Sequence, residues 1–202
     1  VSCARCSRFS AKLGWSGGEF LAGVPGTMGG ALAMNAGAFG SETWTLVEEV
    51  ELVDRAGSFE NRPAGSFVVS YRQVDIPPAH WFTAGVFRLS QGRGDEGANV
   101  RSLLEQRSET QPIRQSSAGS VFRNPPNDYA ARLIEISGLK GLRIGGAQVS
   151  MQHANFIVND RQACAKDIET LIEKAMRVNS EWWECASSSA EEPLAEPPVH
   201  PK

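Results

Sequence analysis

Apolar side chains recur every three to four positions in several stretches of this chain, the spacing of helices that cover a hydrophobic core. Shorter stretches of this kind occupy residues 2–13, 100–107 and 129–136. The clearest stretch is 165–178, where a helix would carry on one face Ile168, Leu171, Ile172, Ala175 and Met176. The pattern predicts four helices.

A second pattern predicts strands. Between Val47 and Val53 apolar residues alternate with acids after one slip, and the turn-forming residues 54–57 predict a hairpin into Phe59. Further apolar runs with strand composition lie at residues 67–72, 81–89, 142–149 and 155–159. The chain is therefore expected to mix helices with short strands.

Two changes in composition divide the chain. Residues 91–98 are polar and glycine-rich, as expected of a loop between domains. Beyond Val178 a serine run, several Glu and four Pro replace any periodic pattern, which is typical of disorder. We expect two domains, at residues 1–95 and 96–178, and a disordered tail at residues 179–202.

Charge and hydropathy narrow the class of partner. The formal net charge is −3 and the basic residues are scattered, so neither a nucleic-acid surface nor an anionic-membrane surface is indicated. No apolar stretch approaches the roughly 18 residues that a membrane span requires. The chain starts at Val1 without a signal-peptide pattern, which predicts a fragment of a cytoplasmic protein.

Four cysteines raise the question of metal or redox chemistry. Cys3 and Cys6 form a C-x-x-C, the spacing of a redox pair or of half a zinc site. No second C-x-x-C or paired histidine motif accompanies them, and the three histidines lie far apart in sequence. We therefore expect two reduced thiols on an ordinary helix and no metal site.

Residues 23–40 carry six glycines in eighteen positions. Each glycine costs roughly 0.5–1 kcal/mol relative to Ala in regular structure, so something must offset that cost. Glycines let backbone N–H groups approach a pyrophosphate closely, and a purely structural turn is the alternative. The segment is not a P-loop, because no Gly-Lys-Ser/Thr follows, and it lacks the preceding strand and later acid of a Rossmann fingerprint. Spacing alone leaves both interpretations open.

Two strings within this segment, GVPGTMGGA at 23–31 and MNAGAFG at 34–40, resemble the flavin-binding loop of the UDP-N-acetylenolpyruvoylglucosamine reductase family. That family belongs to the wider vanillyl-alcohol-oxidase-like (PCMH-type) FAD-binding fold. The resemblance implies an α+β fold, with the second half of that FAD-binding domain at 1–95 and a smaller α/β substrate-binding domain at 96–178. It also implies that the residues along FAD are Pro25, Gly26, Thr27, Gly29, Gly30 and Asn35.

A Ser-Tyr-Arg triplet at residues 70–72 ends one predicted strand. On sequence alone such an arginine is most simply a solvated or ion-paired side chain. The triplet also matches the Tyr-Arg pair of the same family. The resemblance implies that Arg72 is catalytic and stabilises charge beside the substrate carboxylate, and that Tyr71 contacts substrate.

The string AGSVFRNP at residues 118–125 is another match. Its plain interpretation is a tight loop that enters an extended segment, with the hydroxyl group capping backbone. The nucleophile elbow G-x-S-x-G is absent, so serine hydrolysis is not indicated. The resemblance implies that Ser120 is the catalytic proton donor, Asn124 a substrate ligand and Arg123 a candidate phosphate contact.

The strings GLKGLRIGGAQVS at 138–150 and HANFIVN at 153–159 resemble the family's C-terminal substrate domain. Buried strands explain most of both strings, so they support the fold rather than the chemistry. The matches stand in the family's order and cover roughly residues 20–178.

The resemblance implies that FAD and NADPH are the cofactors and that the substrate is a small molecule, the enolpyruvyl ether of a UDP-sugar. Two family features find no match in this chain. They are an early Gly-Gly-Gly-Ser-Asn-type loop and a Leu-Glu-x-Glu-Val-Arg-like ending with a catalytic Glu, a role that neither Glu181 nor Glu184 is assigned. We therefore expect a fragment that binds FAD weakly or not at all.

Two other functions stay open. A non-catalytic remnant of the same fold would bind a sugar nucleotide without flavin. An FAD-dependent alcohol oxidase of the same broad fold is disfavoured by Ser120, by Asn124 and by the absence of a histidine–flavin attachment motif. The oligomeric state does not follow from the sequence.

Overall fold

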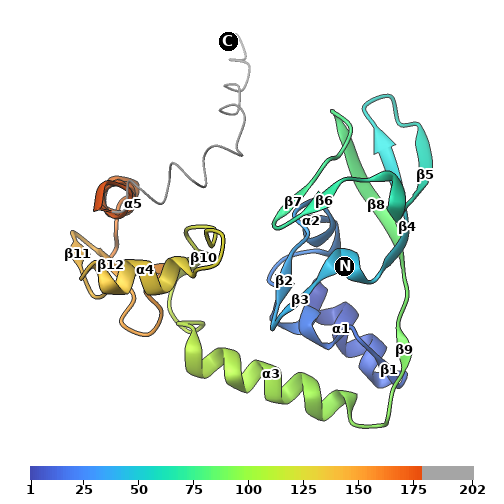
Figure 1. Cartoon of the computed structure of the whole chain (residues 1–202), viewed down its shortest axis with the longest axis horizontal. Coiled ribbons are helices and arrows are strands. Elements are labelled where there is room, and N and C mark those ends of the chain that lie inside the picture. Colours follow the sequence, from blue (N-terminus) through green and yellow to red (C-terminus); the bar gives the residue numbers. More distant parts are fainter. Residues whose placement is uncertain (179–202) are drawn as a thin grey trace. The chain divides into compact units, whose positions relative to one another are not determined.

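The computed structural model describes residues 1–178 of the chain. These residues are divided between Arg107 and Ser108 into two compact units, each of which is described by itself (Figure 1). The division falls inside α3 (Glu96–Thr110) rather than in the glycine-rich stretch before it. The assignment of functional domains to residues 1–95 and 96–178 stays a prediction. The tail at 179–202, which was expected to be disordered, lies outside the described residues.

The first unit contains a three-stranded antiparallel sheet with the strand order β5-β4-β8 (Figure 1). The predicted hairpin is confirmed, because β4 (Val47–Asp54) pairs with β5 (Phe59–Pro63) across the expected turn. On its other side β4 pairs with β8 (His80–Phe87). A register shift between Val47 and Glu49 accounts for the slip in the alternating pattern, since a bulge adds one residue to a strand.

The buried face of this sheet makes the core of the first unit. Val50 and Leu52 are 1% and 0% exposed, and they pack in a cluster with Trp44 and Phe67. The Trp44 and Phe67 rings lie 5.0 Å apart between centroids. The Trp44 indole N–H donates to the Leu32 carbonyl at 2.7 Å, which joins the core to the short helix within the glycine-rich loop.

Short elements complete the first unit. Besides the part of α3 that ends at Arg107, its α-helices are α1 (Cys3–Lys12) and α2 (Met28–Ala33). Its remaining strands form three two-stranded pairs, β1 (Trp15–Ser16) with β9 (Ser90–Gln91), β2 (Gly37–Ala38) with β3 (Ser41–Glu42), and β6 (Val69–Ser70) with β7 (Gln73–Val74).

One strand prediction in the first unit is wrong. Residues 67–72 were expected to form one strand, but only Val69 and Ser70 do so before the chain turns at Tyr71 and Arg72 into β7. The reason is the backbone of Arg72, whose φ of 59° lies in the left-handed region that strand residues do not adopt.

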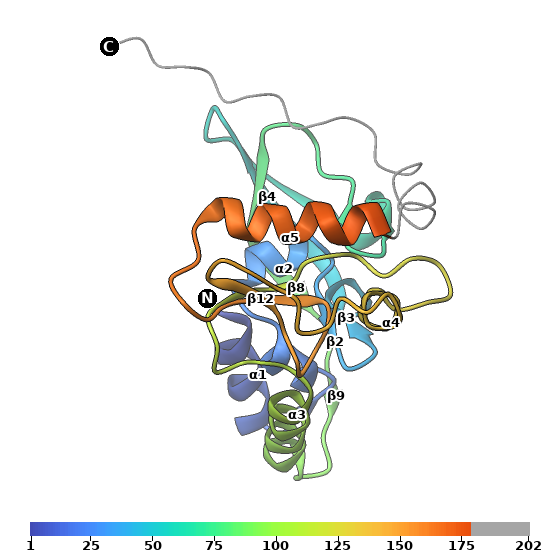
Figure 2. The same ribbon diagram turned by 90° about the vertical axis from the view of Figure 1, so that its left-hand side faces the viewer.

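The second unit contains an antiparallel sheet with the order β10-β13-β12-β11, and α5 lies over β12 (Figure 2). Residues 142–149 were expected to form one strand, and this prediction is also wrong. Gly145, with φ of 51°, and Gly146 form a two-residue turn, as glycine pairs do in tight hairpins. The elements are β10 (Ser117–Ser120), α4 (Ala130–Ile136), β11 (Arg143–Ile144), β12 (Ala147–Val149), β13 (Phe156–Asn159) and α5 (Ala165–Val178).

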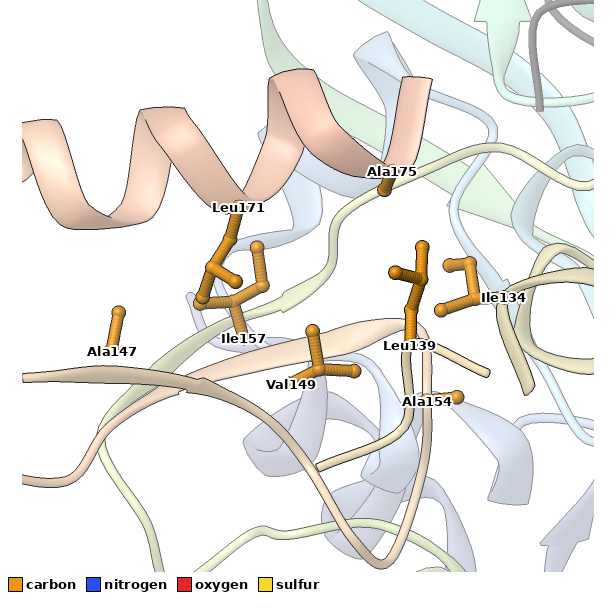
Figure 3. Close-up of a cluster of buried hydrophobic side chains, with 8 residues drawn as sticks. All are labelled: Ile134, Leu139, Ala147, Val149, Ala154, Ile157, Leu171 and Ala175. Atoms are coloured by element: carbon orange, nitrogen blue, oxygen red, sulfur yellow. The ribbon is translucent and has the colours of Figure 1, made fainter. Parts of the chain in front are cut away.

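The amphipathic helix predicted at 165–178 is confirmed as α5. Figure 3 shows Leu171 and Ala175 pointing from α5 toward the sheet, with Ile157 and Val149 beneath them. Leu171 is 1% exposed, whereas Met176, at one edge of the predicted apolar face, is 44% exposed. The core of the second unit therefore depends on the middle of that face.

The two cysteines of the C-x-x-C lie near the start of α1 as free thiols. Cys3 is fully buried, and burial raises the pKa of the Cys3 thiol and of the Cys6 thiol. Within residues 1–178 no group of His, Cys, Asp and Glu is placed to hold a metal ion, and no helix there is long and apolar enough to cross a membrane.

Candidate functional site

The glycine-rich loop, residues 23–40, leaves the core after Val24 and contacts it again at Ala31. Two backbone hydrogen bonds fix it to the start of the chain, from Cys3 N–H to the Gly26 carbonyl at 3.1 Å and from Met28 N–H to the Val1 carbonyl at 2.9 Å. Thr27 then caps α2, because its hydroxyl accepts the Gly30 N–H at 3.2 Å. Five of the six predicted FAD contacts are exposed or half-buried on this stretch, namely Pro25, Gly26, Thr27, Gly29 and Gly30.

The chain's own packing does not explain two of these glycines. Gly29 and Gly30 lie in α2, where alanine is the better helix former. A Cβ on Gly30 would meet only the Thr27 hydroxyl oxygen at 3.6 Å, and one on Gly29 would come no closer than 3.6 Å to any atom. Both distances are ordinary van der Waals contacts. Space that a side chain would fill is thus kept open on the outer side of the loop, as required where a ligand approaches the backbone.

Asn35, the sixth predicted FAD contact, is different because it is only 2% exposed. Its Nδ2 donates to Glu42 Oε2 at 2.8 Å and to the Ser70 carbonyl at 3.1 Å. Its Oδ1 accepts the Trp44 N–H at 3.1 Å. In the structure the Asn35 side chain therefore joins the end of the glycine-rich loop to the turn before Arg72, and its contact with FAD stays a prediction.

Arg72 occupies the tight turn between β6 and β7 and reaches back to the glycine-rich segment. Its Nη1 donates to the Asn35 carbonyl and its Nη2 to the Gly37 carbonyl, both at 3.0 Å. The guanidinium carbon also lies 4.8 Å from the centroid of the exposed Tyr71 ring. The predicted catalytic cation and the end of the predicted cofactor loop are thus in direct contact within one unit.

Glu42 is a site residue that the sequence reasoning missed. Its Oε1 lies 3.5 Å from Arg72 Nη1, and its Oε2 accepts from Asn35. The residue is half-buried and stands in a two-residue strand with no motif of its own, so only its tertiary contacts distinguish it from the other acidic residues of the chain.

Ser120 ends β10 in the second unit, and its side chain is exposed. The pairing of β10 with β13 shifts register between Ser117 and Ser120, and Gly119 has φ of 89°. Such a bulge turns the next side chain away from the regular pleat, and bulges are common beside active sites. The positive φ of Gly119, a conformation that favours glycine, therefore helps to set the direction in which the Ser120 side chain leaves the strand.

Asn155 holds the segment that follows Ser120, and sequence reasoning gave it no role. It is 3% exposed, and its side chain makes two hydrogen bonds with the Phe122 backbone, accepting the N–H at 2.9 Å and donating to the carbonyl at 2.8 Å. Asn124 is half-buried, and its Oδ1 accepts the Ala130 N–H at 3.1 Å at the start of α4. Arg123, which lies between Phe122 and Asn124 in the chain, is exposed. The substrate contacts of Asn124 and Arg123 stay predictions.

His153 is half-buried in the second unit, near this segment in space through its bond to Asn155. Its ring stands edge-on to Phe156 at 4.8 Å between centroids, and its Nδ1 accepts the Asn155 N–H at 3.3 Å. Burial lowers the pKa of His153, and the positive charge of Lys140 acts in the same direction, although a backbone hydrogen bond opposes both. The folded protein therefore favours the neutral ring.

A pH dependence follows from this lowered pKa. As the pH falls below about 6.5, the unfolded chain binds a proton at His153 before the folded chain does, so the second unit is expected to lose stability. Hydrogen exchange of β12 and β13 at pH 7.5 and pH 5.5 measures this loss. The variant His153→Asn keeps an acceptor but cannot titrate, so it should show a smaller loss. An equal loss in both proteins would contradict the expectation.

The structure brings together the predicted site residues of each unit separately. In the first unit the loop, Asn35, Tyr71 and Arg72 form one connected group. In the second unit Ser120 and Asn124 flank the Phe122 backbone that Asn155 holds. The convergence of Arg72 and Ser120 on one reactive centre stays a prediction.

This fold and its exposed glycine-rich loop define part of a FAD-binding domain followed by a second α+β unit. Residues 1–61 match the FAD binding domain family, and residues 111–181 match the family described as UDP-N-acetylenolpyruvoylglucosamine reductase, C-terminal domain. Both parts of the chain are thus similar to UDP-N-acetylenolpyruvoylglucosamine reductases. The expected fold class and the resemblance are confirmed.

Individual relatives agree with this assignment. The UDP-N-acetylenolpyruvoylglucosamine reductase of Methylococcus capsulatus is 57% identical over 173 residues, covering 85% of this chain and 57% of the relative. That of Legionella pneumophila (strain Corby) is 52% identical over 174 residues, covering 85% and 56%. A crystal structure of the Thermus caldophilus reductase (MurB) superposes with a TM-score of 0.80 at 35% identity, covering 87% of this chain and 65% of that one. The chain thus spans less than two thirds of the relatives that it matches.

Proposed function

We propose that this chain takes part in the NADPH-dependent, flavin-dependent reduction of UDP-N-acetylenolpyruvoylglucosamine to UDP-N-acetylmuramate. One observation carries the proposal, namely the contact of the Arg72 guanidinium with the carbonyls of Asn35 and Gly37 at the end of the exposed glycine-rich loop. The glycine-rich loop, which would hold a dinucleotide, and the Arg72 guanidinium, which would bind a carboxylate, are thus in direct contact within the first unit. The names of the relatives support this substrate.

The residues present fit FAD, because the outer side of the loop has open space where Gly26, Gly29 and Gly30 lack side chains. FAD, when bound, supplies the hydride chemistry. Backbone N–H groups of this loop would hold the cofactor, and the absence of side chains would let it approach closely.

Two side chains of this chain would act on the substrate itself. Hydride addition to the terminal methylene carbon leaves negative charge on the carbon beside the carboxylate. A guanidinium directed at that carboxylate, as proposed for Arg72, stabilises the charge without moving during the reaction. The exposed Ser120 hydroxyl would deliver the proton to the carbon, and a neighbouring acid or cation must stabilise the alkoxide, because an alcohol is a weak acid.

The setting of this reaction is part of the proposal. Its product is a precursor of peptidoglycan, so the activity would serve cell-wall synthesis and, through it, cell shape and division. The nucleotide sugar and NADPH are cytoplasmic metabolites, and we place the reaction there.

Two measurements on the chain test the proposal. FAD titration followed by flavin fluorescence gives the affinity, and NADPH oxidation that requires the enolpyruvyl substrate gives the activity. Both should be detected, with weak FAD binding and a correspondingly low activity. Binding of UDP-N-acetylglucosamine without either would instead favour a non-catalytic remnant of the fold.

Gly30→Ala separates a ligand-binding role of the loop from a structural one. Alanine should leave the free energy of unfolding unchanged or raise it by up to about 1 kcal/mol, because it is the better helix former. The same methyl group would stand where the cofactor approaches, so FAD affinity should fall about tenfold, the effect of about 1.4 kcal/mol. Calorimetric titration and thermal unfolding measure the two effects.

Gly97→Ala is the matched control for this substitution. Gly97 also lies in the first turn of a helix, and a Cβ there would meet nothing within 4 Å. It should change stability in the same direction and leave FAD affinity unaltered. Equal FAD affinity in Gly30→Ala and the wild type would contradict the cofactor role of the loop.

A further inference from the structure

Two non-glycine residues with left-handed backbone meet at the end of the glycine-rich segment. Asn35 has φ of 41° and Arg72 has φ of 59°, and Arg72 donates a hydrogen bond to the Asn35 carbonyl. Each such conformation costs on the order of 1 kcal/mol and persists only where the surroundings hold it. Two of them in contact mark a place where the position of a side chain is tightly determined.

The contacts that hold the Arg72 guanidinium differ in kind. The two carbonyls at 3.0 Å fix its plane but carry no net charge. Glu42 supplies the opposite charge, and its Oε1 lies 3.5 Å from Arg72 Nη1. The Arg72 side chain is 26% exposed and the Glu42 side chain 35% exposed. The distance between Oε1 and Nη1 exceeds the roughly 2.7–2.9 Å of a charge-assisted hydrogen bond. Glu42 therefore attracts the guanidinium without taking up the donors that a substrate carboxylate would use.

The structure also holds Glu42 in place. Its Oε2 accepts from Asn35, whose second Nδ2 hydrogen goes to the Ser70 carbonyl, two residues before Arg72. Glu42 pairs with Gly37 across the β2–β3 hairpin. A Cβ on Gly37 would lie 2.3 Å from the Ser41 carbonyl oxygen and 3.0 Å from Glu42 Cγ, so only glycine lets the two strands approach this closely.

We propose that Glu42 is a positioning residue for Arg72. Its carboxylate, anchored by Asn35, draws the guanidinium against the end of the glycine-rich loop and so orients the remaining N–H donors for the substrate carboxylate. Arg72 would touch the substrate, and Glu42 would act only through Arg72. The catalytic part of this inference rests on the proposed function, whereas the contact between the two side chains does not.

Chemical modification tests the contact without any need for activity. Glu42→Gln keeps an acceptor for Asn35 but removes the charge. Arg72 should then react about fivefold faster with p-hydroxyphenylglyoxal, the factor that corresponds to about 1 kcal/mol, as followed by peptide mass spectrometry. Glu48→Gln is the matched control, because Glu48 is ion-paired with Arg88 in the same unit. It should leave the rate at Arg72 unchanged.

Kinetics tests the consequence for catalysis. Glu42→Gln should lower kcat/KM for the enolpyruvyl substrate about tenfold, within the range of coupling between contacting residues. Glu42→Asp keeps the negative charge on a shorter side chain. It should bring both the modification rate of Arg72 and kcat/KM part of the way back to their wild-type values. Recovery by Asp separates positioning from a general loss of structure, and it serves as the deciding variant if Glu42→Gln does not fold.

The outcomes distinguish the inference from the proposed function. An unchanged modification rate at Arg72 in Glu42→Gln would overturn the inference, whatever the activity. A faster rate with unchanged kcat/KM would overturn its catalytic part. If the wild-type chain does not oxidise NADPH with the substrate, the proposed function fails, while the modification rates still decide whether Glu42 positions Arg72.

Discussion

Replacing Arg72 with alanine is expected to lower kcat/KM for UDP-N-acetylenolpyruvoylglucosamine by about a hundredfold or more. Losses of this size are found in other enzymes when one group that stabilises charge in the transition state is removed. The guanidinium is held by two backbone carbonyls of the loop and by Glu42, so its charge is in place before substrate arrives. Alanine removes the charge. Substrate-dependent NADPH oxidation measures the effect.

Two comparisons make this expectation specific. Arg72→Lys retains the charge but cannot reach both carbonyls in a fixed plane, so it should recover only a part of the activity. UDP-N-acetylglucosamine lacks the enolpyruvyl carboxylate, and its affinity should be the same in the wild type and in Arg72→Ala. Equal losses of affinity for both nucleotides would show that Arg72 maintains the fold of the loop rather than binding the carboxylate.

Replacing Leu171 with alanine is expected to lower the free energy of unfolding of the second unit by about 2–5 kcal/mol. Leu171 is 1% exposed and points from the middle of α5 toward Ile157 on the sheet (Figure 3). The change removes buried apolar surface and leaves a cavity that the surrounding strands close only in part. Hydrogen exchange of β12 and β13 followed by mass spectrometry should show protection lost from both strands.

Met176→Ala provides the matched comparison on the same helix. Met176 is 44% exposed, so its truncation should cost less than about 1 kcal/mol. Exchange in β4 of the first unit should be unaltered in both variants. A loss in Leu171→Ala no larger than in Met176→Ala would contradict the assignment of the core.

Much of the fold follows from local patterns. The α5 helix was predicted over its observed length, because five apolar residues at helical spacing leave one stable orientation against a core. The β4–β5 hairpin was predicted in the same way, from alternation and turn residues. Residues 67–72 and 142–149 were misjudged as single strands, since their apolar content masks the left-handed residues Arg72 and Gly145 that turn the chain.

The site was predicted in part. The loop was predicted from its high glycine content and from the resemblance of residues 23–31 and 34–40 to a flavin-binding loop. A ligand that approaches the backbone closely requires glycines, and their number can be seen in the sequence. Glu42 and Asn155 left no such trace. Their roles come from hydrogen bonds to Asn35 and to the Phe122 backbone, partners that are 7 and 33 positions away.

The sequence by itself determined four of the five α-helices of residues 1–178, where the main hairpin turns and which glycine-rich stretch is unusual, because those properties depend on residues that are close along the chain. It missed α2, which lies inside the glycine-rich segment. Only the tertiary structure decided that Arg72 reaches the carbonyls of Asn35 and Gly37 and that Glu42 stands beside it. The physical reason is that β6 and β7 bring residue 72 back to a loop 35 positions earlier. Such contacts depend on how the hairpins pack together, which local spacing does not encode.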